Sequence, residues 1–270
     1  MPRLGVVLQG GPFYAMLDGL RDGLKAVGLE DGQRVVLVIR DAKGDLKPVE
    51  AAAQALEQER VSLIVSFAGL VQSIAKPGGR LTGVHYLSTD LTAKRLEILK
   101  ELLPKLRRVI TFYNPSNPLA REGARSAREA GRKLRVEIVE RPVPAVEALR
   151  AAVRGLKAEQ GDAYFFLPDA MAISQAQVIL DAATAIRLPT MAQDLDLTAK
   201  GVLVCYGVSY REVGREAAMY VQRILAGASP RDLPVQSVDR LTLAVNLKTA
   251  TALGITIPQS VLIRADEVIQ

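Results

Sequence analysis

The chain has little of the two residues that build many active centres, since its 270 residues include one cysteine, Cys205, and one histidine, His85. A single cysteine excludes an internal disulfide and any multi-cysteine metal site. A single histidine excludes a cluster of histidine ligands, and the GxSxG motif of many triad hydrolases is absent. Because Cys205 lies within a strand-like run, we interpret it as a small buried hydrophobe. An enzyme is therefore the weakest function class, and we expect no metal ion.

Nucleotide-binding loops and long apolar runs are missing as well. The first apolar run is followed by the loop Gln9-Gly10-Gly11-Pro12, which lacks the GxGxxG spacing of a dinucleotide site, and GxxxxGK[ST] occurs nowhere. No apolar run approaches the roughly 18 residues that span a bilayer, and Met1-Pro2-Arg3 leads straight into a strand rather than a cleavable signal. We expect no cofactor, and a soluble protein that is either cytosolic or a mature form without its leader.

The charge is positive overall, +6 from 35 basic against 29 acidic residues. Part of the excess lies along one face of a predicted helix, a pattern that nucleic-acid surfaces show, on Arg121, Arg125, Arg128 and Arg132. The same helix carries two glutamates and no aromatic residues, and no helix-turn-helix precedes the first strand. We interpret the arginines as a solvated helix face and expect no nucleic-acid partner.

Short apolar runs rich in branched and aromatic residues are what the sequence does contain. They have almost no polar alternation, which suits strands buried on both faces of a parallel sheet. Segments with helical spacing lie between them, so strand and helix alternate as in right-handed βαβ crossovers, and we predict an α/β fold. The runs are Leu4 to Leu8, Leu63 to Val65, Val109 to Tyr113, Ala163 to Leu167 and Val202 to Tyr206.

Capping signals place several helix ends. Ser174 with Gln177, and Ser209 with Glu212, have the spacing of capping boxes. The second of these opens an amphipathic segment, Tyr210 to Ala226, that Gly227 closes. The spacing also predicts a last helix over Leu247 to Leu253, with Asn246 as its N-cap and Gly254 after its end.

Four stretches of the sequence resemble a known family. They are IAKPGGRLTG (Ile74 to Gly83), LSTDLTAKRLEILKELLP (Leu87 to Pro104), VITFYNPSNP (Val109 to Pro118) and NLKTATALGITIPQSVLIRADEVI (Asn246 to Ile269). The chain resembles, almost end to end, the ABC-transporter substrate-binding proteins that include tryptophan-binding lipoproteins. This resemblance implies a type I periplasmic-binding-protein fold, with two Rossmann-like lobes that have parallel sheets and close on a small ligand around a multi-strand hinge. Such proteins pass their ligand to a membrane permease and are not enzymes.

The length of the chain is comfortable for two lobes. We expect an N-terminal lobe of residues 1–88 plus 208–240 and a C-terminal lobe of residues 89–207 plus 241–270. The resemblance implies an amino acid-like ligand, a membrane permease as partner, and a monomer or weak dimer. It also implies a periplasmic or extracellular location, with attachment to the membrane by a leader that this chain does not contain. If the lack of a signal peptide is genuine, the location is cytoplasmic.

One departure from the family pattern concerns the first lobe. After Ala68 the chain passes directly to Gly69, where family members usually have a loop, a helix and another strand. We therefore expect the first lobe to lack one helix-strand unit, unless residues are missing from the numbering. A lobe reduced in this way is expected to be smaller and to place its exposed side in a dimer contact.

The loops that follow the strands supply the candidate ligand-binding residues, because ligands of open α/β sheets bind outside the carboxyl ends of the strands. A zwitterionic amino acid needs an acceptor for its ammonium and donors for its carboxylate. Asp169 follows a buried strand, and it matches an aspartate often found at this loop in the family, so we predict that it accepts the ammonium. The alternative is that Asp169 ends the strand or caps a turn.

The donors are predicted on two further loops. On the first they are Ser116 and Asn117, and on the second they are the backbone N–H groups of Gly10 and Gly11, where the dipole of the following helix favours an anion. Asn114 and Gln9, on the same loops, are further candidate ligand-binding residues.

Three aromatic residues complete the candidate site. Phe13 and Tyr14 either pack on an apolar or aromatic ligand side chain or belong to a helix face. Tyr206 lies where the chain is expected to cross between lobes, as a hinge or a cleft wall.

Two function classes are thus carried forward beside the enzyme class. The first is transport-associated binding of a small polar organic ligand, most simply an amino acid with an aromatic or branched side chain. The second is a ligand-sensing regulatory domain of the same fold. The absence of a DNA-binding segment counts against the second class.

Overall fold

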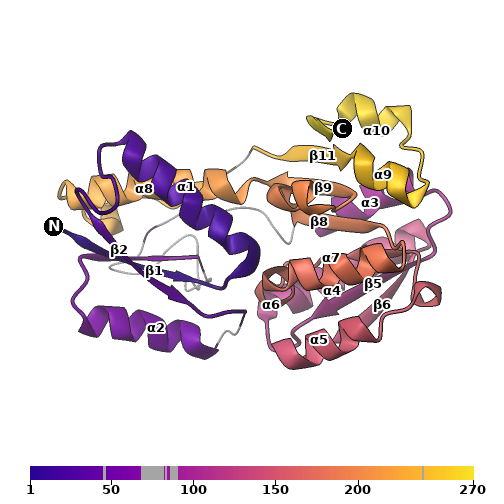
Figure 1. The fold of residues 1–270 in the computed structure, drawn as a ribbon, viewed down its shortest axis with the longest axis horizontal. Coiled ribbons are helices and arrows are strands. Elements are labelled where there is room, and N and C mark those ends of the chain that lie inside the picture. The colour runs from indigo at the N-terminus through magenta and orange to yellow at the C-terminus, as the bar shows by residue number, and fades with distance from the viewer. Residues whose placement is uncertain (45–46, 68–81, 83, 86–90, 239) are drawn as a thin grey trace. The chain divides into compact units, whose positions relative to one another are not determined.

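The computed structural model describes residues 1–44, 47–67, 82, 84–85, 91–238 and 240–270. Contacts between Cα atoms divide the chain into two compact units (Figure 1). Unit 1 consists of Met1–Tyr86 and Ser209–Asp239, and unit 2 of Leu87–Val208 and Arg240–Gln270. The chain therefore passes between the units three times. That these units act as lobes closing on a ligand stays a prediction.

Unit 1 is built on a three-stranded parallel sheet with strand order β2-β1-β3. Helix α2 covers one face, and α1 and α8 lie together on the other (Figure 1). A short pair, β4 with β10, forms a second parallel sheet. The elements are β1 Arg3–Leu8, η1 Gly11–Phe13, α1 Tyr14–Ala26, β2 Val36–Asp41, α2 Lys47–Gln58, β3 Leu63–Ser66, β4 Val84–His85, α8 Tyr210–Leu225, η4 Pro230–Asp232 and β10 Gln236–Ser237.

Burial in this sheet matches the sequence in one strand and not in another. The side chains from Leu4 to Leu8 in β1 are buried, as expected for a strand covered on both faces. All four residues of β3 are only half-buried, so the expectation of complete burial is wrong there. The reason is its position, because β3 is the last strand of this sheet in the part of the chain that the structure describes.

Glycines allow α1 and α8 to approach closely. A Cβ added to Gly214 would stand 1.9 Å from the carbonyl oxygen of Met16, and one on Gly19 would stand 1.8 Å from that of Arg211. Real side chains do not tolerate such distances, so these positions require glycine. At the start of the two helices, the rings of Phe13 and Tyr210 stack with centroids 5.5 Å apart.

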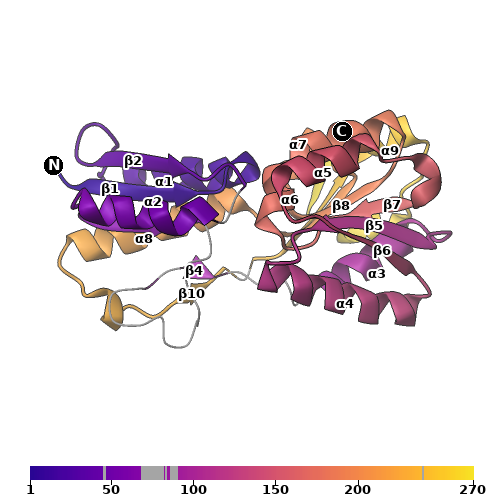
Figure 2. The same ribbon diagram turned by 90° about the horizontal axis from the view of Figure 1, so that it is seen from below.

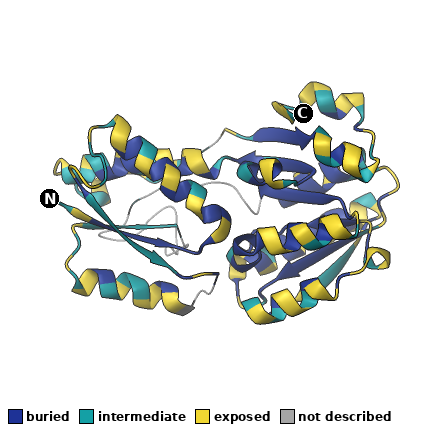
Figure 3. Ribbon diagram, in the orientation of Figure 1, coloured by how far each residue is buried: buried dark blue, intermediate teal, exposed yellow. Residues whose placement is uncertain are grey.

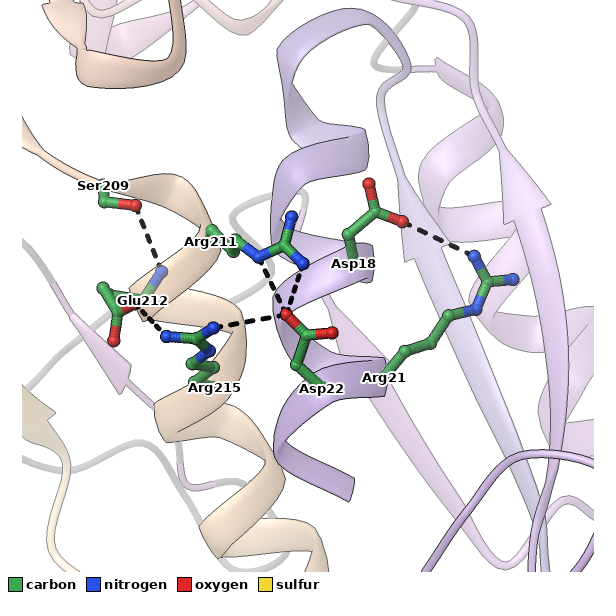
Figure 4. Close-up of polar contacts among 7 residues, drawn as sticks. All are labelled: Asp18, Arg21, Asp22, Ser209, Arg211, Glu212 and Arg215. Carbon is green, nitrogen blue, oxygen red and sulfur yellow. Dashed lines mark hydrogen bonds and ion pairs between the residues drawn. The ribbon is translucent and has the colours of Figure 1, made fainter. Parts of the chain in front are cut away.

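Ion pairs on the surface of unit 1 tie the same two helices together. Asp22 of α1 accepts a hydrogen bond from Arg211 Nε of α8 at 2.8 Å, and Arg215 lies 3.4 Å from the same carboxylate oxygen (Figure 4). These hydrogen bonds and charges, led by that from Arg211, lower the pKa of Asp22. Ser209 Oγ accepts from Glu212 N at 3.3 Å, which confirms Ser209 as the N-cap of α8.

Unit 2 contains a seven-stranded sheet with order β12-β11-β9-β8-β7-β5-β6. All neighbouring strands are parallel except β11 with β9, which are antiparallel. Helices α3 and α4 cover one face, and α5 and α7 cover the other (Figure 2). Strands β7 and β8, in the middle of the sheet, are buried along their whole length (Figure 3). This unit therefore confirms the predicted α/β class.

The elements of unit 2 are α3 Thr92–Leu102, β5 Arg108–Tyr113, α4 Pro118–Leu134, β6 Glu137–Pro142, α5 Val146–Arg154, η2 Ala158–Gln160, β7 Ala163–Phe165, α6 Ala170–Ser174, α7 Ala176–Ala185, β8 Thr190–Asp194, η3 Leu195–Lys200, β9 Val204–Val208, β11 Thr242–Asn246, α9 Leu247–Leu253, α10 Gln259–Arg264 and β12 Glu267–Ile269.

Two of the expected helix signals in unit 2 have different outcomes. Asn246 accepts from Thr249 N at 2.9 Å and Gly254 is left-handed, which confirms both ends of α9. The capping box of Ser174 with Gln177 is wrong, because Ser174 is the last residue of α6. Its hydroxyl donates back to Met171 O at 2.7 Å, and the following helix starts from Gln175.

Two features bear on the remaining expectations. In the part of the chain that the structure describes, no helix combines the length and apolar character that crossing a bilayer requires. Ala68 and Gly69 lie outside the described residues. The loss of a helix-strand unit at that point, and the dimer contact expected from it, therefore stay predictions.

Candidate functional site

In unit 1 the loop between β1 and α1 turns sharply at two glycines. Gly10 has φ 71° and Gly11 has φ 56°, values in the left-handed region that favours glycine. Phe13 N donates to Gly10 O at 3.2 Å, which closes the turn into the helix. The loop therefore lies at the carboxyl end of the central strand of the sheet, as the sequence predicted.

Two predicted residues of this loop have opposite environments. Phe13 is buried and stacks on Tyr210, so its ring is part of the packing between α1 and α8. Tyr14 is 43% exposed, so its ring is open to a partner. Of the two aromatic candidates, only Tyr14 offers a surface within unit 1.

Asp41, at the end of β2, faces this loop. Tyr14 Oη donates to Asp41 Oδ2 at 3.0 Å, and Lys43 N donates to Asp41 Oδ1 at 2.8 Å. A Cβ on Gly10 would stand 3.1 Å from Asp41 Oδ1, so the carboxylate lies directly against the glycine turn. Burial, and then the hydrogen bond to Asp41, raise the pKa of Tyr14 and keep its phenol protonated.

Gln9 directly follows β1, at the same end of the sheet as Tyr14 and Asp41. Its side chain is 1% exposed, and Nε2 has no hydrogen-bond partner among the described residues. A buried amide donor without a partner costs free energy, so it is normally satisfied by water or by a ligand. The side chain of Gln9 thus has an unused donor, and its place in the ligand site stays a prediction.

In unit 2 the loops after β5 and β7 are joined through Asp169. The carboxylate is 0% exposed, and it accepts from Asn114 N at 2.7 Å and from Asn117 Nδ2 at 2.9 Å. Asn117 Oδ1 in turn accepts from Leu119 N at 3.1 Å, which caps helix α4. The structure therefore brings together three of the predicted residues.

The electrostatics of Asp169 reflect its burial. Loss of water raises the pKa of its carboxyl, and the hydrogen bond from Asn117 and those from backbone amides act in the opposite direction. Both oxygens already have donors within unit 2. These contacts support the alternative that Asp169 fixes the loop, and its predicted role as ammonium acceptor stays a prediction.

The other predicted residues of unit 2 lie in different surroundings. Ser116 is exposed at the tip of the loop, where its N–H donates to Asn114 Oδ1 at 2.9 Å. Tyr206 is in the interior of β9 and is half-buried against the core of unit 2. The carbonyl of Tyr206 accepts from Arg95 Nε at 2.7 Å, so its backbone is anchored to α3.

Sequence reasoning missed polar residues at the ends of β2 and β8. Asp194 closes β8 and is buried, with Oδ1 accepting from Asp196 N at 3.1 Å. Its Oδ2 has no partner among the described residues, and burial raises its pKa well above the usual carboxyl value. Gln193 beside it donates to Leu167 O at 3.3 Å. The sequence signal that could have revealed them is an acidic residue at the end of each strand, Asp41 in β2 and Asp194 in β8.

The described residues include no group of three or more histidine, cysteine or acidic side chains arranged to hold a metal ion. What the two loop clusters offer is hydrogen bonding: an exposed aromatic ring with a carboxylate in unit 1, and buried amides in unit 2. Groups of this kind bind polar organic molecules.

Comparison with known proteins places these loops in context. A tyrosine-binding protein from Clostridioides difficile is 25% identical over 263 residues, covering 87% of this chain and 75% of that protein. The alignment is 263 positions long, which is more than 87% of the 270 residues of this chain. Some residues of the relative therefore have no counterpart in this chain.

Solved structures share the fold. A conserved domain protein from Vibrio cholerae matches with a TM-score of 0.86 at 26% identity, covering 99% of both chains. An ABC domain in complex with L-Trp from Streptococcus pneumonia matches with a TM-score of 0.85 at 22% identity and the same coverage. More distantly, a LacI family transcriptional regulator from Arthrobacter, in complex with lactose, matches with a TM-score of 0.62 at 15% identity, covering 89% of this chain and 97% of that chain.

A family profile decides the classification. The family described as ABC transporter substrate binding protein matches residues 67–269, most of the chain. Its members are typically extracellular or periplasmic, and as a class they bind solutes rather than catalyse reactions. The fold neighbours are of the type I periplasmic-binding-protein kind. The chain belongs to the ABC transporter substrate binding protein family.

Proposed function

We propose that this protein is the solute-binding component of an ABC importer and that its ligand is an amino acid, with an aromatic side chain favoured. The observation that carries the proposal is the pair of polar loop clusters at the carboxyl ends of the strands, one in each unit, in a chain of this family. A relative named for tyrosine and a fold neighbour holding L-Trp support the ligand class.

In this proposal the ligand is held by the residues predicted from the sequence. In unit 1 these are Gln9, Gly10, Gly11 and Tyr14, and in unit 2 they are Asn114, Ser116 and Asn117, with Asp169 holding their loop. Phe13 is assigned to the packing of α1 against α8 through its stack on Tyr210. Tyr206 is assigned to the strand that carries the chain towards Ser209, where unit 1 resumes.

The proposal includes a membrane permease as partner and a periplasmic or extracellular location, with attachment to the membrane through a leader. Binding proteins of importers meet their ligand outside the cytoplasmic membrane and pass it to the permease there, so this location follows from the proposed role.

Calorimetry with a defined panel tests the ligand class. We expect L-tyrosine or L-tryptophan to bind with micromolar or tighter affinity, and L-leucine more weakly. D-ribose is the control, because it has no ammonium or carboxylate. Native mass spectrometry of freshly purified protein checks for retained ligand. Binding of the sugar without any amino acid would contradict the proposal.

The second candidate function is a ligand-sensing regulatory domain, which the likeness to a LacI family regulator favours at the level of fold. Amino-acid binding alone does not separate the two. We expect the purified protein with its ligand to stimulate ATP hydrolysis by its partner permease–ATPase complex, reconstituted in liposomes. No stimulation, together with ligand-dependent binding to a DNA-binding protein, would favour the regulatory function.

A further inference from the structure

The strand ends of unit 1 hold a carboxylate that the sequence did not single out. Asp41 ends β2 directly beside the turn at Gly10 that ends β1, so it lies at the ligand edge of the parallel sheet. Tyr14 Oη donates to one of its oxygens and Lys43 N to the other. Two elements of the chain therefore fix the position of this carboxylate.

The carboxylate of Asp41 retains capacity for a cation. Each carboxylate oxygen has two lone-pair sites, and each accepts one hydrogen bond from the described residues. None of the described lysine or arginine side chains forms an ion pair with it. The phenol of Tyr14 stays a donor, because its pKa is raised and it remains protonated. The described residues thus orient the charge on Asp41 and do not neutralise it.

Asp169, the other candidate acceptor, differs on each of these points. It has no exposed surface, while Asp41 is half-buried. Two of its donors come from the loop after β5, which it holds in place. Removing Asp169 would release this loop, whereas removing Asp41 releases one phenol hydrogen bond and one turn.

A second observation at the same edge points to a ligand with a carboxylate. Gln9 lies in the same loop as Gly10, is almost wholly buried, and has an Nε2 donor without a partner among the described residues. A donor and an acceptor left open on one loop cluster match the two charged groups of an α-amino acid.

We infer that Asp41, oriented by Tyr14, accepts the ammonium group of an amino-acid ligand and that Asp169 does not. This inference rests on the proposed function. Gln9 supplies a donor for the ligand carboxylate, and the exposed ring of Tyr14 lies beside the bound group. Residues of unit 1 then recognise the ammonium group and contribute to recognition of the carboxylate.

The test measures affinity by calorimetry for Asp41→Asn and Asp169→Asn, each with L-tyrosine, L-tryptophan and their desamino analogues, 3-(4-hydroxyphenyl)propionate and indole-3-propionate. We expect Asp41→Asn to weaken amino-acid binding by about tenfold to a hundredfold, the effect of one charged hydrogen bond. Binding of the analogues should not weaken, because they lack the ammonium. Asp169→Asn should affect amino acids and analogues equally.

The matched control is Asp18→Asn, another carboxylate of unit 1, which lies on α1 and pairs with Arg21 at 3.6 Å (Figure 4). It should leave affinity unchanged, and thermal melting checks that every variant is folded. If Asp41→Asn binds the amino acids as the natural protein does, the inference is overturned while the proposed function stands. If the natural protein binds no amino acid in the panel, both are contradicted.

Discussion

Asn117 Nδ2 donates a hydrogen bond to Asp169 Oδ1 at 2.9 Å, and both side chains are buried. The two residues belong to loops that follow different strands of unit 2, and the backbone of Asn114 reaches the other oxygen of the same carboxylate. A buried carboxylate with two directed donors ties these loops into one body. The carboxylate of Asp169 therefore stabilises the two loops, and we expect it to affect ligand binding through their position.

Replacing Asp169 by alanine is expected to destabilise unit 2. The change leaves Asn114 N and Asn117 Nδ2 without their acceptor, and each buried donor that loses its partner costs about 1–3 kcal/mol. Urea unfolding should show this loss. The control is Asp181→Ala, an exposed carboxylate bonded to Gln177, which should change stability by less than about 0.5 kcal/mol. Equal stability of both variants would assign Asp169 no structural role.

The sequence predicted the strands of unit 2 where apolar residues run without interruption, as in Val109 to Tyr113. It did not reveal β8, because Thr190, Gln193 and Asp194 give that strand a polar composition although all of its residues are buried. Strand β8 is buried because it lies between β9 and β7, and these contacts cannot be read from the sequence of β8 itself.

The candidate site shows the same division. The carboxyl ends of the strands were predictable from topology, and the loops at Gln9 and Asn114 lie there. The sequence did not show which carboxylate already has hydrogen-bond donors on both oxygens. The donors to Asp169 are Asn114 and Asn117, which lie 55 and 52 residues away in the chain. Asp41 was missed because its partner Tyr14 is 27 residues away.

Asp194 is expected to make stability depend on pH. Burial raises its pKa in the folded state, so the folded protein binds the proton more tightly than the unfolded chain. The contribution of Asp194 to stability is therefore fully present at low pH and is lost as the pH rises from the ordinary carboxyl value through the raised pKa. Asp194→Asn cannot ionise, and its amide oxygen can still accept from Asp196 N.

Urea unfolding of both proteins at pH 4.5 and pH 8 checks this expectation. The free energy of unfolding of Asp194→Asn, relative to the natural protein, should increase with pH. Titrating groups that do not interact with Asp194 are common to both proteins and cancel in the difference. A relative stability that decreases with pH would show that the carboxylate of Asp194 is stabilised in its charged form.

Gly214→Ala is expected to separate α1 from α8. The new Cβ would stand 1.9 Å from Met16 O and 2.8 Å from Leu20 N, and these are backbone atoms that cannot rotate away. Overpacking of this kind costs about 1–3 kcal/mol or more. The control is Gly155→Ala at the end of α5, where φ is −88° and the nearest atom would be 3.6 Å away. Chemical denaturation should show a loss only for Gly214→Ala, and equal losses would contradict the packing argument.

Cys205 is expected to be unreactive in the folded protein. It lies in β9 with no exposed surface, and burial raises the pKa of its thiol, so both access and the thiolate are missing. Iodoacetamide at pH 8 should modify it only at the rate at which unit 2 unfolds, and completely in concentrated urea. The variant Ala151→Cys places a second thiol on an exposed position of α5 and should react quickly in the same sample. Mass spectrometry distinguishes the two sites, and native modification of Cys205 as fast as that of residue 151 would show that β9 is accessible in the folded chain.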